Sequence, residues 1–209
     1  MTTDLAADRL FVRDLLKACR VPSGGRVIDV GCGDGATVGH CVALGRSAAG
    51  IDDADVPDNG LDLHRGVLAN SVPFAAGEAD LAIVRGMDAY AGDLSGIESL
   101  ISTANLLSCL RPLGRAAFLL EDAVAPAGSA ETDRQAEIIE HFAVFPGRCR
   151  VTPVSEGLGR FLSPSFLLGR RPRRGGQFVI VQIPKQPISR LEWHGYAREA
   201  AMAGIRRAA

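Results

Sequence analysis

The residues best suited to chemistry lie between 26 and 37, where an apolar run meets three glycines at alternate positions and then a helical pattern. Gly31, Gly33 and Gly35 can adopt backbone angles that other residues avoid, and their missing side chains let a ligand lie against the main chain at a helix N-terminus. Asp29 precedes them at the carboxyl end of the apolar run, where a carboxylate favours a positively charged ligand over one carrying only phosphates. The segment predicts a nucleotide-cofactor loop, and a cationic cofactor is the leading interpretation.

The cysteines and histidines give little support for other site chemistry. No Cys-x-x-Cys pair occurs, and no two histidines stand at metal-ligand spacing, so we expect reduced core thiols and no metal site. The residues concerned are Cys19, Cys32, Cys41, Cys109, Cys149, His40, His64, His141 and His194.

Size and composition favour one α/β domain covering residues 1–209. Hydrophobic residues make up 47% and charged residues 22% of the chain, as in ordinary folded proteins, and no window reaches the apolar length of a bilayer span. The first residues lack the features of a secretion signal or transit peptide. We therefore expect no membrane segment and a cytoplasmic protein.

Charge is divided unevenly along the chain, although the formal net charge is only −1. Residues 27–98 contain twelve acids and three bases, whereas residues 146–209 contain three acids and twelve bases. A nucleic-acid partner could use the basic region Arg148–Arg174 through phosphate contacts. Because only Phe161 and Phe166 are nearby to stack on bases, a solvated loop is the favoured interpretation.

Periodicity and turn residues predict strands that alternate with helices after a lead helix within residues 1–25. Gly45 is the expected end of the first helix after the glycines, and Ser189-x-x-Glu192 has the pattern of a capping box. A basic loop or lid is expected over 146–176. The expected strands are 26–30, 47–51, 63–68, 80–84, 115–120, 148–154 and 177–183, and the expected helices are 36–44, 94–110, 132–142 and 188–209.

Two of these helices carry apolar residues that predict how they pack. The helix over 94–110 places Ile97, Leu100, Ile101, Ala104 and Leu107 on one face, which we expect to be buried. The C-terminal helix carries Leu191, Trp193 and Tyr196, and we expect it to dock on the body of the protein rather than on a second copy.

Together these patterns resemble the class I S-adenosylmethionine-dependent methyltransferases, especially the small-molecule type. The resemblance is good over residues 21–120 and rests on element order elsewhere. Residues 27–35 match the family's first motif, Val72-Pro-Phe74 and Glu78-Ala-Asp80 match its segment before strand four, and Leu110–Arg115 matches its turn before strand five. The resemblance implies a Rossmann-like, doubly wound, seven-stranded, mostly parallel sheet with an antiparallel last strand and helices on both faces.

The resemblance also implies S-adenosyl-L-methionine as cofactor and a small-molecule methyl acceptor. Asp52 stands where the family's acid at the end of strand two takes both ribose hydroxyls, and Asp53 follows it. Arg85 follows strand four at the carboxyl end of the sheet, where it could border the cofactor; a surface cation is the alternative interpretation. The full expected cofactor-binding set is Asp29, Gly31, Cys32, Gly33, Asp34, Gly35, Asp52, Asp53, Leu68, Ala69 and Arg85.

The chain departs from the family pattern at three places. Leu68-Ala69 stands where many members have an acid that binds the adenine amino group, so adenine recognition must use backbone groups or apolar contact. Leu113 replaces a frequent second glycine. Arg85-Gly-Met-Asp88 lacks the Asn/Asp-Pro-Pro-Tyr/Phe signature of enzymes that methylate exocyclic amines of nucleic-acid bases, which disfavours that reaction.

Several alternatives remain open from the residues alone. The glycines also satisfy the looser dinucleotide fingerprint, although Asp29 would repel a pyrophosphate. An RNA or protein methyltransferase, and a non-catalytic relative of the fold, are further alternatives. We assign no catalytic base; the candidates are Tyr90, Glu121, Asp122 and His141. Magnesium-dependent methylation through Asp88 and Asp122 is a minor alternative.

Overall fold

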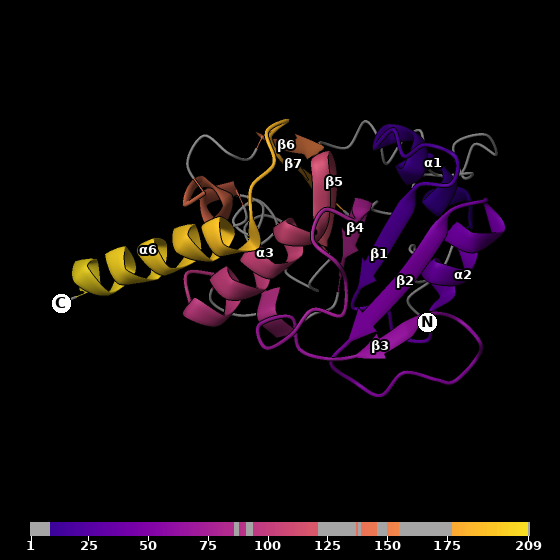
Figure 1. Ribbon diagram of the computed structural model, residues 1–209, viewed down its shortest axis with the longest axis horizontal. Coiled ribbons are helices and arrows are strands. Elements are labelled where there is room, and N and C mark those ends of the chain that lie inside the picture. Colours follow the sequence, from indigo (N-terminus) through magenta and orange to yellow (C-terminus); the bar gives the residue numbers. More distant parts are fainter. Residues whose placement is uncertain are drawn as a thin grey trace, which may run out of the picture.

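The computed structural model describes residues 9–85, 88–90, 94–120, 137, 139–145, 150–154 and 177–208. Figure 1 shows helices packed around one twisted sheet. The strands are β1 (Arg26–Val30), β2 (Ser47–Asp52), β3 (Leu63–Arg65), β4 (Ala79–Val84), β5 (Leu110–Leu120), β6 (Arg150–Val154) and β7 (Gln177–Gln182). The helices are α1 (Arg9–Ala18), α2 (Ala36–Ala43), α3 (Ile97–Cys109) and α6 (Arg190–Ala208), with a 3-10 turn η2 (Asp88–Tyr90).

The seven strands follow the order β3-β2-β1-β4-β5-β7-β6. Strands β1 to β5 pair in parallel, and β7 runs antiparallel between β5 and β6. The α/β architecture, its mostly parallel sheet and its antiparallel last strand are confirmed. The central strands are buried on both faces, as their continuous apolar sequences predict; every residue of β4 is buried. The carboxyl ends of β1, β2 and β4 meet at one edge of the sheet, beyond which the glycine loop lies.

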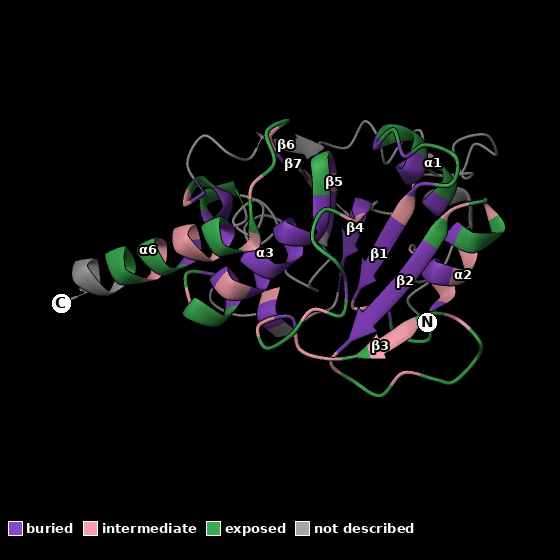
Figure 2. Ribbon diagram, in the orientation of Figure 1, coloured by how far each residue is buried: buried purple, intermediate pink, exposed green. Residues whose placement is uncertain are grey.

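Helices cover both faces of the sheet (Figure 2), and the sheet separates two clusters of buried apolar residues. On one face, Val12 and Leu16 of α1 and Val38 of α2 pack with Val27 and Leu81. On the other face, α3 and α6 pack together with the apolar residues Ile28, Val84, Leu100, Leu107 and Trp193. Because α6 lies over α3, α3 is buried nearly all round from Ser99 to Cys109.

The helix expected over 94–110 begins later and presents a different face than the sequence predicts. It starts at Ile97, whose side chain is 53% exposed, so placing Ile97 on the buried face is wrong. The buried positions include Ser102, Thr103 and Asn105, because the second helix α6 covers the side that a lone amphipathic helix would turn to water.

Strand boundaries differ where the backbone bends. The segment 111–114, expected as a turn, belongs to β5, which begins at Leu110 and shifts its register against β4 between Ala79 and Leu81. Leu113 adopts φ 65°, the left-handed conformation that favours glycine, which explains why the resembling family often has glycine there. β3 ends at Arg65 rather than Leu68, which lies instead in a turn.

The C-terminal helix α6 begins with the expected capping box. Ser189 Oγ accepts a hydrogen bond from the Glu192 N–H at 3.2 Å, and Glu192 Oε2 accepts from the Ser189 N–H at 2.8 Å. Trp193 and Ala197 are buried in the core, which confirms that α6 packs on the body of its own chain. Leu191, however, is 79% exposed and does not belong to the packed face. Figure 1 shows the far end of α6 extending past the sheet.

Several sequence expectations lie outside the described residues. They include Glu121, Asp122, Cys149 and most of the basic region 148–174, and only the end of the helix expected over 132–142 is described. None of the helices in the described part of the chain combines the length and the apolar composition needed to cross a bilayer.

Candidate functional site

The glycine loop crosses the carboxyl end of β2, to which it is fixed by backbone hydrogen bonds. The N–H groups of Gly31 and Cys32 donate to the Ile51 carbonyl at 2.8 and 3.2 Å. Gly31, Gly33 and Gly35 have φ values of 78°, 53° and 83°. All three therefore need the left-handed freedom that the sequence pattern predicts, and the loop presents main chain rather than side chains at this edge.

Asp52 binds the glycine loop from the end of β2. Its Oδ2 accepts a hydrogen bond from the Gly33 N–H at 2.8 Å, and its Oδ1 accepts one from the Ala54 N–H at 2.9 Å. The side chain is 9% exposed. Since each carboxylate oxygen can accept more than one hydrogen bond, Asp52 keeps capacity for a ligand hydroxyl. Asp53 follows it, half-buried.

Asp29 and Arg85 form a buried ion pair between the ends of β1 and β4. Asp29 Oδ2 lies 3.2 Å from an Arg85 guanidinium nitrogen, and the two side chains are 1% and 9% exposed. The same nitrogen of Arg85 donates to the Cys32 carbonyl at 3.5 Å. The structure thus brings Arg85 to the glycine loop. It also gives Asp29 a protein cation as partner, which the sequence did not reveal.

Cys32 is a packing residue within the loop. Burial, followed by the nearby carboxylates of Asp29 and Asp52, raises the pKa of its thiol to about 12, so the thiol stays protonated and poorly nucleophilic. A Cβ at Gly50 would lie 2.7 Å from Cys32 Sγ, so Gly50 leaves the space that Cys32 fills. The exposed Asp34 accepts a hydrogen bond from the Ala36 N–H at 3.0 Å at the start of α2.

Leu68 and Ala69 lie in a turn after β3, at the same edge of the sheet. The turn is closed by the N–H groups of Asn70 and Ser71, which donate to the Val67 carbonyl. Leu68 buries its side chain completely in the core, and its carbonyl accepts a hydrogen bond from Asn105 Nδ2 at 2.6 Å. Leu68 can therefore offer only main chain to a ligand, and Ala69 is half-buried.

A second cluster of polar side chains lies beside β5, where the Tyr90 ring contacts the Phe118 ring. Thr103 Oγ1 is 3.3 Å from the Tyr90 hydroxyl and 2.7 Å from His141 Nε2, while His141 Nδ1 donates to the Leu94 carbonyl at 2.7 Å. Burial raises the pKa of the Tyr90 hydroxyl above its ordinary value. Two of the candidate bases are thus joined through Thr103, which the sequence did not single out.

Sequence reasoning missed Thr103, Asn105 and His194 as parts of this region. His194 Nε2 lies 2.8 Å from Asn105 Oδ1, so α6 contacts the residue that binds the Leu68 carbonyl. The available signal was a run of polar residues inside an otherwise apolar helix. These polar residues are buried because α6 covers them, and this packing is visible only in the structure.

Comparison with known proteins identifies the fold. No protein-family model and no curated protein matches the sequence. Among solved structures, the plantazolicin methyltransferase BpumL in complex with SAH has a TM-score of 0.60 at 12% identity, with 87% of this chain and 86% of that chain covered.

Two further neighbours agree. The 1,6-didemethyltoxoflavin-N1-methyltransferase of Burkholderia thailandensis has a TM-score of 0.54 at 15% identity over 88% of this chain and 80% of that one. A TehB-like SAM-dependent methyltransferase from Corynebacterium glutamicum has a TM-score of 0.52 at 17% identity, with 84% of this chain and 88% of that chain covered. With the strand order and the glycine loop described above, the chain has the fold of the class I S-adenosylmethionine-dependent methyltransferases.

Proposed function

We propose that this protein is an S-adenosylmethionine-dependent methyltransferase that acts on a small-molecule acceptor. The observation that carries the proposal is the contact between Asp52 and the N–H of Gly33, at the end of two adjacent parallel strands. It joins a bare-peptide loop to a carboxylate with spare acceptor capacity, and this pair suits a nucleoside whose ribose must be held beside main chain.

The residues present fit this cofactor. Gly31, Gly33 and Gly35 would leave room for its amino-acid part against the peptide, and Asp52 would accept hydrogen bonds from both ribose hydroxyls. The Asp29–Arg85 pair would help to order the glycine loop, because Arg85 also donates a hydrogen bond to the Cys32 carbonyl. Its buried carboxylate adds negative potential near a cationic ligand, but Arg85 reduces that effect.

The cofactor, when bound, supplies a methyl group activated by a sulfonium centre. The protein has to align the acceptor with that carbon and keep water away. If the methyl acceptor loses a proton during transfer, a base has to take up that proton. Among the described residues, the hydrogen-bonded chain of Tyr90, Thr103 and His141 is suited to this. With His141 neutral and Nδ1 donating to Leu94, Thr103 can donate to Nε2 and accept from Tyr90.

Support for a small acceptor comes from the neighbouring toxoflavin enzyme, whose structure holds 1,6-didemethyltoxoflavin and S-adenosylhomocysteine. A non-catalytic binding protein is the second candidate. It is favoured by the commitment of Asp29 to Arg85 and by the missing acid at Leu68-Ala69, both of which remove cofactor contacts that the family resemblance implies.

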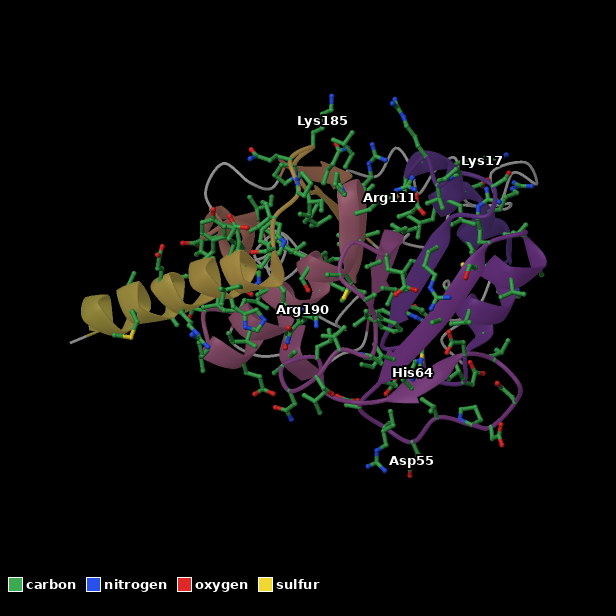
Figure 3. The ribbon with its side chains drawn as sticks, viewed as in Figure 1. Lys17, Asp55, His64, Arg111, Lys185 and Arg190 are labelled. Carbon is green, nitrogen blue, oxygen red and sulfur yellow. The ribbon has the colours of Figure 1, made fainter. Side chains whose placement is uncertain are left out.

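Calorimetry with S-adenosylmethionine and S-adenosylhomocysteine tests the proposal, with NADH as the competing ligand. We expect Asp52→Ala to weaken binding by about 1 to 3 kcal/mol, the range for loss of a charged hydrogen-bond acceptor. Asp55→Ala is the matched control, because Asp55 is an exposed acid three residues further along (Figure 3), where it forms an ion pair with Arg65. Absence of heat at millimolar ligand, or unchanged affinity in Asp52→Ala, would contradict the proposal.

A further inference from the structure

The C-terminal helix α6 is tied to the turn after β3 by hydrogen bonds that pass through α3. His194 Nε2 lies 2.8 Å from Asn105 Oδ1, and Asn105 Nδ2 donates to the Leu68 carbonyl at 2.6 Å. Since Asn105 uses its amide nitrogen toward a carbonyl, its oxygen faces His194 and His194 Nε2 is the donor. One buried amide thus connects two segments that are far apart in the sequence.

A second connection runs beside the first. Arg190, at the start of α6 (Figure 3), donates to Ser108 Oγ at 3.0 Å and to the Phe74 carbonyl at 3.1 Å. Ser108 Oγ in turn donates to the Asn105 carbonyl at 2.7 Å. Both connections end on the stretch between β3 and β4, so the first two turns of α6 hold this stretch at two points.

The held stretch is continuous with the glycine-loop site. The Gly66 N–H donates to the Asp52 carbonyl at 2.8 Å, and the Asp52 side chain accepts from the Gly33 N–H. Leu68 lies two residues after Gly66, within the turn whose hydrogen bonds end on the Val67 carbonyl. A nucleoside whose ribose is held by Asp52 would therefore extend its base over residues 66–69.

Apart from the backbone hydrogen bonds at Gly66 and Val67, few contacts fix this turn. Residues 66–71 contain no acidic or basic side chain, β3 is only three residues long, and the connection from β2 to β3 contains no helix. Leu68 supplies a buried apolar anchor, but a main-chain ligand contact also needs the peptide planes fixed. The hydrogen bond from Asn105 to the Leu68 carbonyl does this directly.

We propose that Asn105 and His194 are positioning residues for the base end of the cofactor site, and that docking of α6 thereby sets cofactor affinity. This inference rests on the proposed function. Because coupling between two sites is reciprocal, cofactor binding must also stabilise the docked α6. The first two turns of α6 are the part most affected, since they carry Arg190 and His194.

The test is calorimetry with S-adenosylhomocysteine on the full chain. We expect His194→Ala and Asn105→Ala each to raise Kd by about 3-fold to 30-fold, the range for removing one member of a buried hydrogen-bond network. His194→Gln, which keeps a side-chain N–H donor, should recover part of the affinity. Glu199→Ala is the matched control on the exposed face of the same helix and should bind as the wild type does.

A double-mutant cycle separates positioning from general loss of stability. If His194 acts through Asn105, the double variant should bind no more weakly than Asn105→Ala alone, whereas independent effects would multiply. Circular dichroism at the assay temperature checks that each variant is folded. His194→Ala, which alters a half-buried side chain, provides the test even if Asn105→Ala does not fold.

Hydrogen exchange gives a readout independent of affinity. S-adenosylhomocysteine should slow exchange of amides in the first two turns of α6 by about threefold or more in the wild type, and not in Asn105→Ala or His194→Ala. Affinities within twofold of the wild type in both folded variants would overturn this inference and leave the proposed function standing. Wild-type protein that binds no S-adenosylhomocysteine would overturn both.

Discussion

At the scale of single residues, the site depends on groups whose role is set by backbone conformation and by partners. Gly35 sits at φ 83° with Leu63 close to where a Cβ would lie, while Gly39, one turn into α2, has ordinary helical geometry. Asp52 and Asp29 are both carboxylates at strand ends, yet one faces backbone N–H groups and the other faces Arg85. Residue type alone does not separate these roles.

The two glycines make a matched pair for mutation. Gly35→Ala should destabilise the protein by about 1 to 2 kcal/mol, because a Cβ in the left-handed conformation is strained and would lie 2.9 Å from Leu63 Cδ1. Gly39→Ala should stabilise it by about 0.5 to 1 kcal/mol, because its nearest neighbour would lie 3.8 Å away and alanine favours helix. Urea denaturation measures both, and equal effects in the two variants would refute the assignment of strain to Gly35.

At the scale of elements, α6 decides more of the structure than its position at the end of the chain suggests. It covers α3, buries the polar residues of that helix and supplies Trp193 to the core. Its start is fixed by the capping box of Ser189 and Glu192, with both partners at hydrogen-bond distance. The stability of this first turn therefore matters for everything that α6 holds.

Removing the cap should loosen that turn. Ser189→Ala is expected to lower the free energy of unfolding by about 0.5 to 2 kcal/mol, the usual range for an N-cap serine. Amides of residues 190–193 should exchange faster, as followed by hydrogen-exchange mass spectrometry. Ser23→Ala, at an exposed turn position, serves as the control. If Ser189→Ala exchanged as slowly as the control, the cap would not contribute to α6.

At the scale of the whole molecule, stability should respond to the charge of His194. Burial, and then the nearby Arg198 and Arg190, lower its pKa in the folded protein from the ordinary value of 6.5. The unfolded chain then takes up a proton at higher pH than the folded protein does. Stability from this group is fully present above about pH 6.5 and is lost as the pH falls through the folded pKa.

His194→Gln removes this titration. Between pH 7.5 and pH 5, the wild type should lose more stability than His194→Gln does, because only the wild type has to protonate His194 on unfolding. Urea denaturation followed by fluorescence of Trp193, the single tryptophan, measures the difference. Parallel pH profiles for the two proteins would mean that His194 titrates alike in both states.

The sequence by itself determined the central strands and the glycine loop. Continuous apolar runs fixed β1, β2 and β4 to within a residue or so, and alternate glycines fixed the strand-to-helix turn. Asp52 was singled out because the resembling family has an acid at the end of its second strand. These features are local, so spacing along the chain carries them. The α/β order then followed from alternating strands and helices.

Only the tertiary structure decided which side chains meet. The pairing of Asp29 with Arg85 joins residues 56 positions apart, and the contact of Asn105 with His194 joins residues 89 apart. Ser102, Thr103 and Asn105 are buried because α6 covers a second side of α3. Ile97 and Leu191 are exposed because they lie in the first turns of α3 and α6. Periodicity gives one apolar stripe for a helix, but the number of neighbours that cover the helix is a property of the packed molecule.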